Sequence, residues 1–265
     1  MSYNIIHHVL KLYWKYKSSI LQKNIFKDFK RATKERNLIF PDNFFLPANY
    51  GRGMPERVVE IFLCWLSYRS GYRVLDVGHA NAMVCHRNMI RTLPEPKNIT
   101  GIDIAVPVYE VERIYNKSIL GDITDVSLPD NSFDLIWCIS ALEHFGMDNS
   151  GYTDNFTKKN GMDIQAIKEM VRLLTIGGSV LITVPYGKWE DHGWLRNYDK
   201  EHLHSLLNVI IQKTKIREWY FRHTFGSGWS MVKPDELSYV GYYDQNNSGS
   251  GGLAAIYITK LNNMR

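Results

Sequence analysis

Two carboxylates stand at the ends of apolar runs in the first half of this chain. Asp76 lies in the run Val74–Val77, which breaks at Gly78 into small residues, and Asp103 ends a second run that begins at Ile99. Glycine permits a positive φ and a close backbone approach, and a carboxylate can accept two hydrogen bonds from a ribose diol. A strand, a tight glycine turn and an acid after the next strand are typical of sites for nucleotide-like ligands.

A histidine follows a third apolar run. Phe133–Ile139 has the composition of a buried strand, and Ser140 and His144 come directly after it. Ligands of open α/β sheets lie off the carboxyl ends of the strands, so these side chains should border a reaction site. Histidine, with an unperturbed pKa near 6.5, can take up a proton at neutral pH. His144 is therefore a candidate base; the alternatives are a structural or ligand contact and a metal ligand.

The segment after the expected strand Ser179–Val184 is rich in aromatic, histidine and acidic residues. Aromatic faces pack on the C–H groups of pyranoses, and planar polar groups bind hydroxyls, so this composition is typical of a sugar-binding surface. Asp191 and His192 could act together in proton transfer, and Arg196 could bind an anionic group. A solvated loop is the alternative. The candidate substrate contacts in this segment are Tyr186, Trp189 and Arg196.

Two further segments border the expected site. The polar, glycine-punctuated stretch Gly146–Gly161 is predicted to be a lid or a substrate-contacting loop before the next helix. Its chemically interesting residues, with the nearby Asp163, are Tyr152 and Asp154, and Tyr152 is the candidate substrate contact. Upstream, Pro55 introduces an apolar helix predicted over Val58–Leu66. Arg57, at the start of that helix, could hold an anionic group or could simply pack at the surface.

Composition limits the size of the core and the cellular location that can be expected. The chain has 265 residues, 45% of them hydrophobic, which is enough for one sizeable α/β core. Its three cysteines form no C-x-x-C pair, so neither a disulfide framework nor a zinc site is indicated, which favours a cytoplasmic location. No apolar run approaches the roughly 20 residues of a membrane span, and no signal-peptide core is present.

Charge is unevenly placed along the chain. The net charge is +5, but residues 1–40 hold nine Lys or Arg against Asp28 and Glu35, a balance of +7. We predict that residues 1–66 form a basic helical cap and entry segment and that residues 67–265 form the main domain. The apolar face of the predicted cap helix is formed by Ile6, Val9, Leu10, Tyr13, Ile20 and Leu21.

The basic face of this cap has two interpretations. It is either solvated, with the helix packed on the core, or it meets anionic lipid head groups or a polyanionic substrate at the inner membrane face. No motif supports a nucleic-acid partner, and none is expected. The oligomeric state is not indicated by the sequence.

Four segments in order carry a family resemblance. The runs VLDVGHANA, TGIDIA, LGDITDVSLPDNSFDLIWCISALEH and EMVRLLTIGGSVLITVP resemble the cofactor-side motifs of class I S-adenosylmethionine-dependent methyltransferases, over roughly residues 70–186. The resemblance implies an α/β, Rossmann-like, doubly wound and mostly parallel sheet of seven strands, with the last strand antiparallel beside strand five. S-adenosyl-L-methionine is the implied cofactor, and no metal is implied.

The resemblance also assigns residues. It places the adenine contact at Asp122 and the ribose contact at Asp103. The full set of implied cofactor-binding residues is Asp76, Gly78, His79, Ala80, Asp103, Ile104, Asp122, Ile123 and Ser140. One departure is visible: the family's loop usually reads G-x-G-x-G, and here Gly78 is followed by alanine at both later positions.

The acceptor is the most open question. The entry segment Tyr50–Arg57 resembles that of methyltransferases of polysaccharide and surface-glycan biosynthesis, which implies O-methylation of a sugar hydroxyl in a glycan, nucleotide-sugar or lipid-linked saccharide. A methyltransferase of small molecules or natural products is an alternative. The altered glycine loop leaves a second one, a non-catalytic binding or scaffold protein. Cys138-Ile-Ser-Ala141 matches neither motif of the nucleic-acid base methyltransferases.

Overall fold

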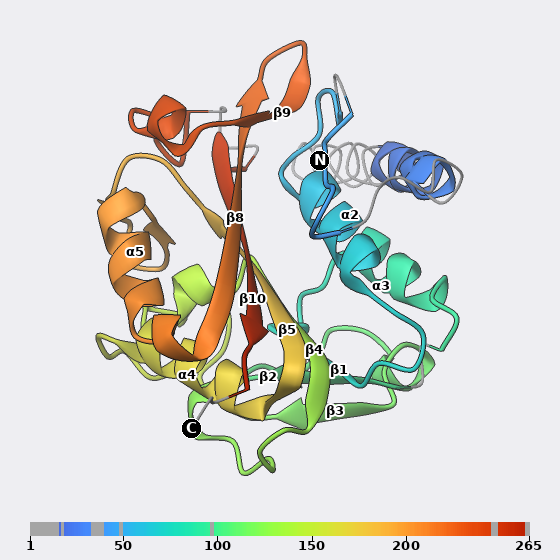
Figure 1. Cartoon of the computed structure of the whole chain (residues 1–265), viewed down its shortest axis with the longest axis vertical. Helices are drawn as coiled ribbons and strands as arrows, with labels where there is room; N and C mark the ends of the chain where they lie inside the picture. Colours follow the sequence, from blue (N-terminus) through green and yellow to red (C-terminus); the bar gives the residue numbers. More distant parts are fainter. Residues whose placement is uncertain are drawn as a thin grey trace, which may run out of the picture.

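The computed structural model describes residues 16, 19–32, 40–47, 50–95, 98–244 and 249–262. Within them, one eight-stranded sheet has the order β3-β2-β1-β4-β5-β10-β8-β9 (Figure 1). Its strands are β1 (Val74–Val77), β2 (Ile99–Asp103), β3 (Lys117–Leu120), β4 (Phe133–Ile139), β5 (Leu174–Pro185), β8 (Thr214–Thr224), β9 (Gly228–Val232) and β10 (Gly252–Lys260). A separate ribbon pairs β6 (Glu190–Asp191) with β7 (Arg196–Asn197).

The sheet is Rossmann-like and mostly parallel. Strands β3, β2, β1, β4 and β5 pair in parallel, while β10 lies antiparallel between β5 and β8. The antiparallel strand beside strand five is therefore where the sequence predicted it. The predicted count of seven is wrong, because the chain after β8 turns back at Gly226 and pairs as β9 instead of remaining a loop through Trp229.

Helices cover both faces of the sheet. Figure 1 shows α2 (Arg57–Ser67) and α3 (Val84–Arg91) on one side and α4 (Met162–Leu173) and α5 (Lys200–Asn208) on the other. Short 3₁₀ helices lie in the connections: η2 (Val111–Arg113), η3 (Ile123–Asp125), η4 (Leu142–His144), η5 (Ile211–Lys213) and η6 (Pro234–Leu237).

Side chains alternate between two cores. Along β4, Leu135 and Trp137 belong to the core under α2 and α3, whereas Ile136 and Cys138 belong to the core under α4. Successive side chains of a strand point to opposite faces, so a parallel strand covered on both sides must be apolar throughout. This explains why the sequence of β4 is continuously apolar from Leu135 to Ile139.

The described part of the N-terminal segment shares the first of these cores. Residues 19–32 are helical, and Leu21, Ile25 and Phe29 are buried at a spacing of four residues. The ring of Phe29 stacks on that of Trp65 in α2 at a centroid distance of 4.4 Å. Most of the predicted apolar face (Ile6, Val9, Leu10 and Tyr13) lies outside the described residues. No helix among the described residues is long and apolar enough to cross a membrane.

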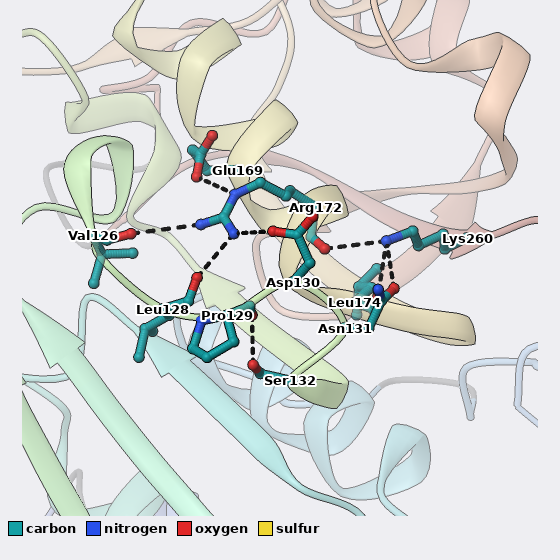
Figure 2. A network of polar contacts seen from close by, with 10 residues as sticks. All are labelled: Val126, Leu128, Pro129, Asp130, Asn131, Ser132, Glu169, Arg172, Leu174 and Lys260. Atoms are coloured by element: carbon teal, nitrogen blue, oxygen red, sulfur yellow. Dashed lines mark hydrogen bonds and ion pairs between the residues drawn. The ribbon is translucent and has the colours of Figure 1, made fainter.

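Two cations fix the turn that leads into β4 (Figure 2). The guanidinium of Arg172, in α4, donates to the carbonyl oxygens of Leu128 at 2.9 Å and Val126 at 3.5 Å, and it pairs with Asp130. The ammonium of Lys260, the last residue of β10, donates to three oxygens nearby: Asn131 Oδ1, Arg172 O and Leu174 O. The start of β4 is thereby tied to α4 and to β10.

Replacing Arg172 with methionine should destabilise the protein by about 1–3 kcal/mol, because two carbonyl groups and the carboxylates of Asp130 and Glu169 lose their donor. Lys168→Met is the matched control, since Lys168 is exposed on the same helix. Urea denaturation of both variants checks this. An equal loss of unfolding free energy in Arg172→Met and Lys168→Met would show that the guanidinium contacts contribute nothing to stability.

Candidate functional site

The carboxyl ends of β1, β2 and β4 meet at one edge of the sheet. Val77, at the end of β1, pairs with Ile102 on one side and Cys138 on the other. A cavity of about 510 Å³ opens at this edge. The residues that line it include Arg57, Asp76, Gly78, His79, Met83, Asp103, Ile104, Asp122, Ile123, Ser140, His144, Asp148, Asn149, Tyr152 and Trp194.

The turn after β1 is held in a left-handed conformation. Gly78 has φ +83° and donates its N–H to Ile102 O at 2.9 Å. A Cβ at this position would lie 2.6 Å from Cβ of Ala141, so only glycine fits. Two residues on, the N–H of Ala80 donates to Asp103 Oδ2 at 2.8 Å. Ala80, predicted as a cofactor contact, is therefore buried behind the turn and does not line the cavity.

His79 packs inside the turn. Its Nδ1 lies 2.9 Å from the hydroxyl of Tyr109, which itself donates to His79 O, and its Nε2 lies 3.0 Å from the hydroxyl of Ser118. Because the single proton of Tyr109 is used, Nδ1 donates to the Tyr109 oxygen, and in the neutral imidazole Nε2 accepts from Ser118. Burial lowers the pKa of His79, which favours this form. A Cβ at Gly101 would lie 2.5 Å from the ring, so Gly101 makes its space.

Asp76 is ionised and bound by two donors from other segments. Its Oδ2 accepts hydrogen bonds from His86 Nε2 at 2.9 Å and from the hydroxyl of Tyr115 at 2.6 Å. Burial alone would raise its pKa, but these two donors outweigh burial and hold the pKa of Asp76 below its usual value. The carboxylate therefore joins the glycine turn to α3 and to the chain before β3.

Asp103 and Asp122 line the cavity from neighbouring strands. The Oδ1 of Asp103 accepts the N–H of Ala105 at 2.9 Å, and its Oδ2 accepts the hydroxyl of Tyr152 at 2.8 Å in addition to the Ala80 N–H. Asp122 caps η3, with its Oδ1 accepting both the N–H and the hydroxyl of Thr124. Two of the predicted acids thus have carboxylates fixed by the backbone at one side of the cavity.

His144 ends η4 at the other side of the cavity. Its Nδ1 lies 2.8 Å from the carbonyl oxygen of Trp194, which can only accept, so Nδ1 carries the proton and Nε2 keeps a lone pair. The ring of Trp194 lies over the imidazole at a centroid distance of 5.4 Å. Burial lowers the pKa of His144, so the ring is neutral at pH 7. Within the described residues, no cluster of His, Cys, Asp and Glu is arranged to hold a metal.

A buried carboxylate supports the end of β4. Glu60, in α2, accepts hydrogen bonds from Ser140 Oγ at 2.5 Å, Thr183 Oγ1 at 2.8 Å and Arg57 Nη1 at 2.8 Å. Ser140 has φ +42°, a strained conformation for a residue with a side chain, and Glu60 holds it there. Arg57 lines the cavity, and its guanidinium forms an ion pair with Glu60.

Two more carboxyls lie near this cluster. Burial raises the pKa of Glu56 to about 7 and that of Glu143 to about 8. Among the described residues, neither Oε2 atom has a hydrogen-bond partner. Glu143 Oε1 is 3.9 Å from His144 Nε2, too far for a hydrogen bond. At neutral pH Glu143 is therefore largely uncharged beside the candidate base.

The predicted substrate contacts after β5 do not reach the cavity. Tyr186 is buried in the core, and Arg196 turns inward to pair with Asp163 at 3.3 Å and to donate to Phe145 O at 2.9 Å. Trp189 stacks on His202 at 3.6 Å, on a separate surface. For Arg196 the physical reason is the β6–β7 ribbon, in which it pairs with Asp191.

The second predicted proton-transfer pair is also outside the lining. Asp191 accepts the N–H of Gly193 at 2.8 Å, which closes the turn between β6 and β7. His192 packs against Tyr243 at a centroid distance of 4.9 Å and lies 3.4 Å from Glu190. Trp194 is the residue of this segment that borders the cavity, and it was not among the residues predicted from the sequence. The aromatic composition signalled a site here but did not indicate which ring faces it.

Comparison with known families gives a match at this part of the chain. Residues 75–182, from β1 into β5, match the family described as methyltransferase domain. This segment resembles a methyltransferase domain. The match supports S-adenosylmethionine as the cofactor, as the resemblance implied.

Individual relatives are distant. An uncharacterised protein of Methanocaldococcus jannaschii is 23% identical over 145 residues, and the match spans 55% of this chain and 55% of that protein. The YcgJ protein of Bacillus subtilis is 14% identical, with a TM-score of 0.48 over 77% of this chain and 99% of that one. The 1,6-didemethyltoxoflavin-N1-methyltransferase of Burkholderia thailandensis, solved with S-adenosylhomocysteine, is 12% identical, with a TM-score of 0.46 over 71% of each chain.

The packing of His79 against Gly101 can be tested by substitution. Gly101→Ala should destabilise the protein by about 1–3 kcal/mol, because the added methyl group overlaps the imidazole. Gly121→Ala is the control, since its nearest side-chain atom is 3.9 Å from the added Cβ. In urea denaturation, Gly101→Ala should lower the free energy of unfolding much less in a His79→Ala background than in the wild type. An equal cost in both backgrounds would contradict the account.

Proposed function

We propose that this chain is an S-adenosylmethionine-dependent methyltransferase that methylates a hydroxyl group held beside His144. The observation that carries the proposal is the continuity of one cavity. It joins the Gly78 turn and the carboxylates of Asp103 and Asp122 to a neutral histidine whose tautomer is fixed by a carbonyl group. The matched methyltransferase domain spans the same strands.

The residues at one side of this cavity suit the cofactor. Gly78 exposes its backbone at the cavity, and the carboxylate of Asp103 suits a ribose diol. We assign Asp122, Ile104 and Ile123 to the adenine and Arg57 or Ser140 to the methionyl end. When bound, S-adenosylmethionine supplies a methyl group on a positively charged sulfur.

His144 is assigned the role of base. Its Nε2 retains a lone pair because Nδ1 donates to the carbonyl of Trp194, so Nε2 can accept the proton that a hydroxyl releases on methylation. The lowered pKa of His144 keeps Nε2 unprotonated at neutral pH. General base catalysis of this kind contributes roughly 10²–10⁴ in rate.

The acceptor that we propose is a sugar hydroxyl, in a glycan, a nucleotide-sugar or a lipid-linked saccharide. The support lies in the side chains next to His144: the partly exposed ring of Trp194 and the polar groups of Asp148 and Asn149 all line the cavity. An aromatic face with neighbouring carboxylate and amide groups suits a pyranose. Tyr186, Trp189 and Arg196, which the sequence predicted as sugar contacts, lie outside the cavity and do not support this proposal.

We further propose a cytoplasmic location with contact to an anionic partner through the N-terminal segment. Cys64, Cys85 and Cys138 are buried free thiols, which suits a reducing compartment. In the helical residues 19–32, four basic side chains accompany Asp28, while the apolar positions pack on the core. A basic face of this kind suits a lipid-linked saccharide or an anionic membrane surface.

The base assignment predicts a specific pattern of kinetics. His144→Gln should reduce methyl transfer to sugar acceptors by about 10²–10⁴ while S-adenosylhomocysteine binding is kept. In the wild type, turnover should be flat around neutral pH and should fall with acid only as pH drops through a pKa below 6.5, because the neutral form is active and burial lowers the pKa.

Transfer of a labelled methyl group at several pH values measures both effects. His204→Gln is the control, because His204 is exposed on α5. Full turnover in His144→Gln with the true acceptor would show that another group, or none, takes the proton.

A further inference from the structure

We propose that Tyr152 is a latch on the cofactor site: its hydroxyl occupies the ribose-binding carboxylate of Asp103 and is displaced when the ribose binds. This inference rests on the proposed function, since it takes Asp103 as the ribose contact. The observation behind it is the hydrogen bond from Tyr152 Oη to Asp103 Oδ2, 2.8 Å long.

The acceptor capacity of Asp103 shows why the two ligands compete. A carboxylate offers about four lone-pair positions. Three are used: Oδ2 accepts the Ala80 N–H and the Tyr152 hydroxyl, and Oδ1 accepts the Ala105 N–H. A ribose diol needs two positions. The N–H groups of Ala80 and Ala105 belong to the backbone that forms the site, so the Tyr152 hydroxyl is the donor that must be displaced.

The loop that carries Tyr152 has a fixed base. Gly146 has φ +74° and Gly161 has φ +79°, both left-handed. The N–H of Lys159 donates to Gly146 O at 3.1 Å, and a Cβ at Gly146 would lie 2.0 Å from Lys159 O. The two ends of the loop therefore cross in close contact, and the segment between them can shift without disturbing α4.

The tip of the loop is held less firmly. Tyr152 is 36% exposed, so withdrawing its ring from Asp103 opens no gap in either core. Its N–H and that of Thr153 both donate to Asn149 O, which makes a local turn. Burial and the Asp103 carboxylate raise the pKa of Tyr152, so the phenol remains a donor at every working pH.

The same loop contacts the acceptor side. Asn149 Nδ2 donates to His144 O at 2.9 Å, and the Asp148 N–H donates to Gly193 O, next to the Trp194 carbonyl that fixes the His144 tautomer. The loop that carries Tyr152 is therefore bonded to the backbone of the candidate base. The latch couples an occupied cofactor site to the position of the loop over the acceptor.

The test compares Tyr152→Phe with the wild type by calorimetric titration. S-adenosylhomocysteine and adenosine should bind about tenfold more tightly to the variant, because no charge-assisted hydrogen bond has to be broken. Binding of 2′,3′-dideoxyadenosine, which has no diol, should change much less. Tyr239→Phe is the matched control, since Tyr239 is exposed and lies under Arg222, away from the cavity.

Hydrogen exchange of the wild type gives a second readout that needs no variant. Saturating S-adenosylhomocysteine should speed amide exchange in residues 150–157 while slowing it in residues 78–82. Unchanged or weaker binding of S-adenosylhomocysteine to Tyr152→Phe, or slower exchange in residues 150–157, overturns the latch and leaves the proposed function standing. No binding to either protein overturns the cofactor assignment and the latch with it.

Discussion

The arrangement of the site depends on the parallel pairing of three strands. Because β1 lies between β2 and β4, Val77 is paired on both sides, and the carboxyl ends of all three strands lie at the same edge of the sheet. That pairing brings the Gly78 turn, Asp103 and the Ser140–His144 segment together from positions far apart in the sequence. Parallel strands need crossover connections, and the helices that make them also bury both faces of the sheet.

Local pattern was sufficient to predict this part of the structure. Apolar runs bounded by glycine or an acid identify β1, β2 and β4, and a residue at the carboxyl end of a parallel strand must border the ligand edge. Asp76, Asp103 and His144 followed from that rule alone. The extra strand β9 did not follow, because its residues carry no alternating pattern and it forms only by pairing with the neighbouring β8.

Tertiary contacts decided what the sequence left open. Arg196 and Tyr186 have the right composition for a substrate surface, but the β6–β7 ribbon turns Arg196 toward Asp163, a partner 33 residues away. His79 stands where the family has a variable residue, and only the packing shows that Gly101 makes room for it. The raised pKa of Glu143 likewise comes from burial, which no local pattern indicates.

The Gly78 turn and Asp103 should bind the cofactor, and calorimetric titration with S-adenosylhomocysteine measures this. We expect binding in the micromolar range, on the order of −8 kcal/mol. We also expect a loss of about tenfold or more in Asp103→Asn, which keeps the shape of the side chain but loses its charge. Asp235→Asn, on the exposed η6, should bind as the wild type does. Absence of binding to the wild type, or equal binding to Asp103→Asn, would contradict the account.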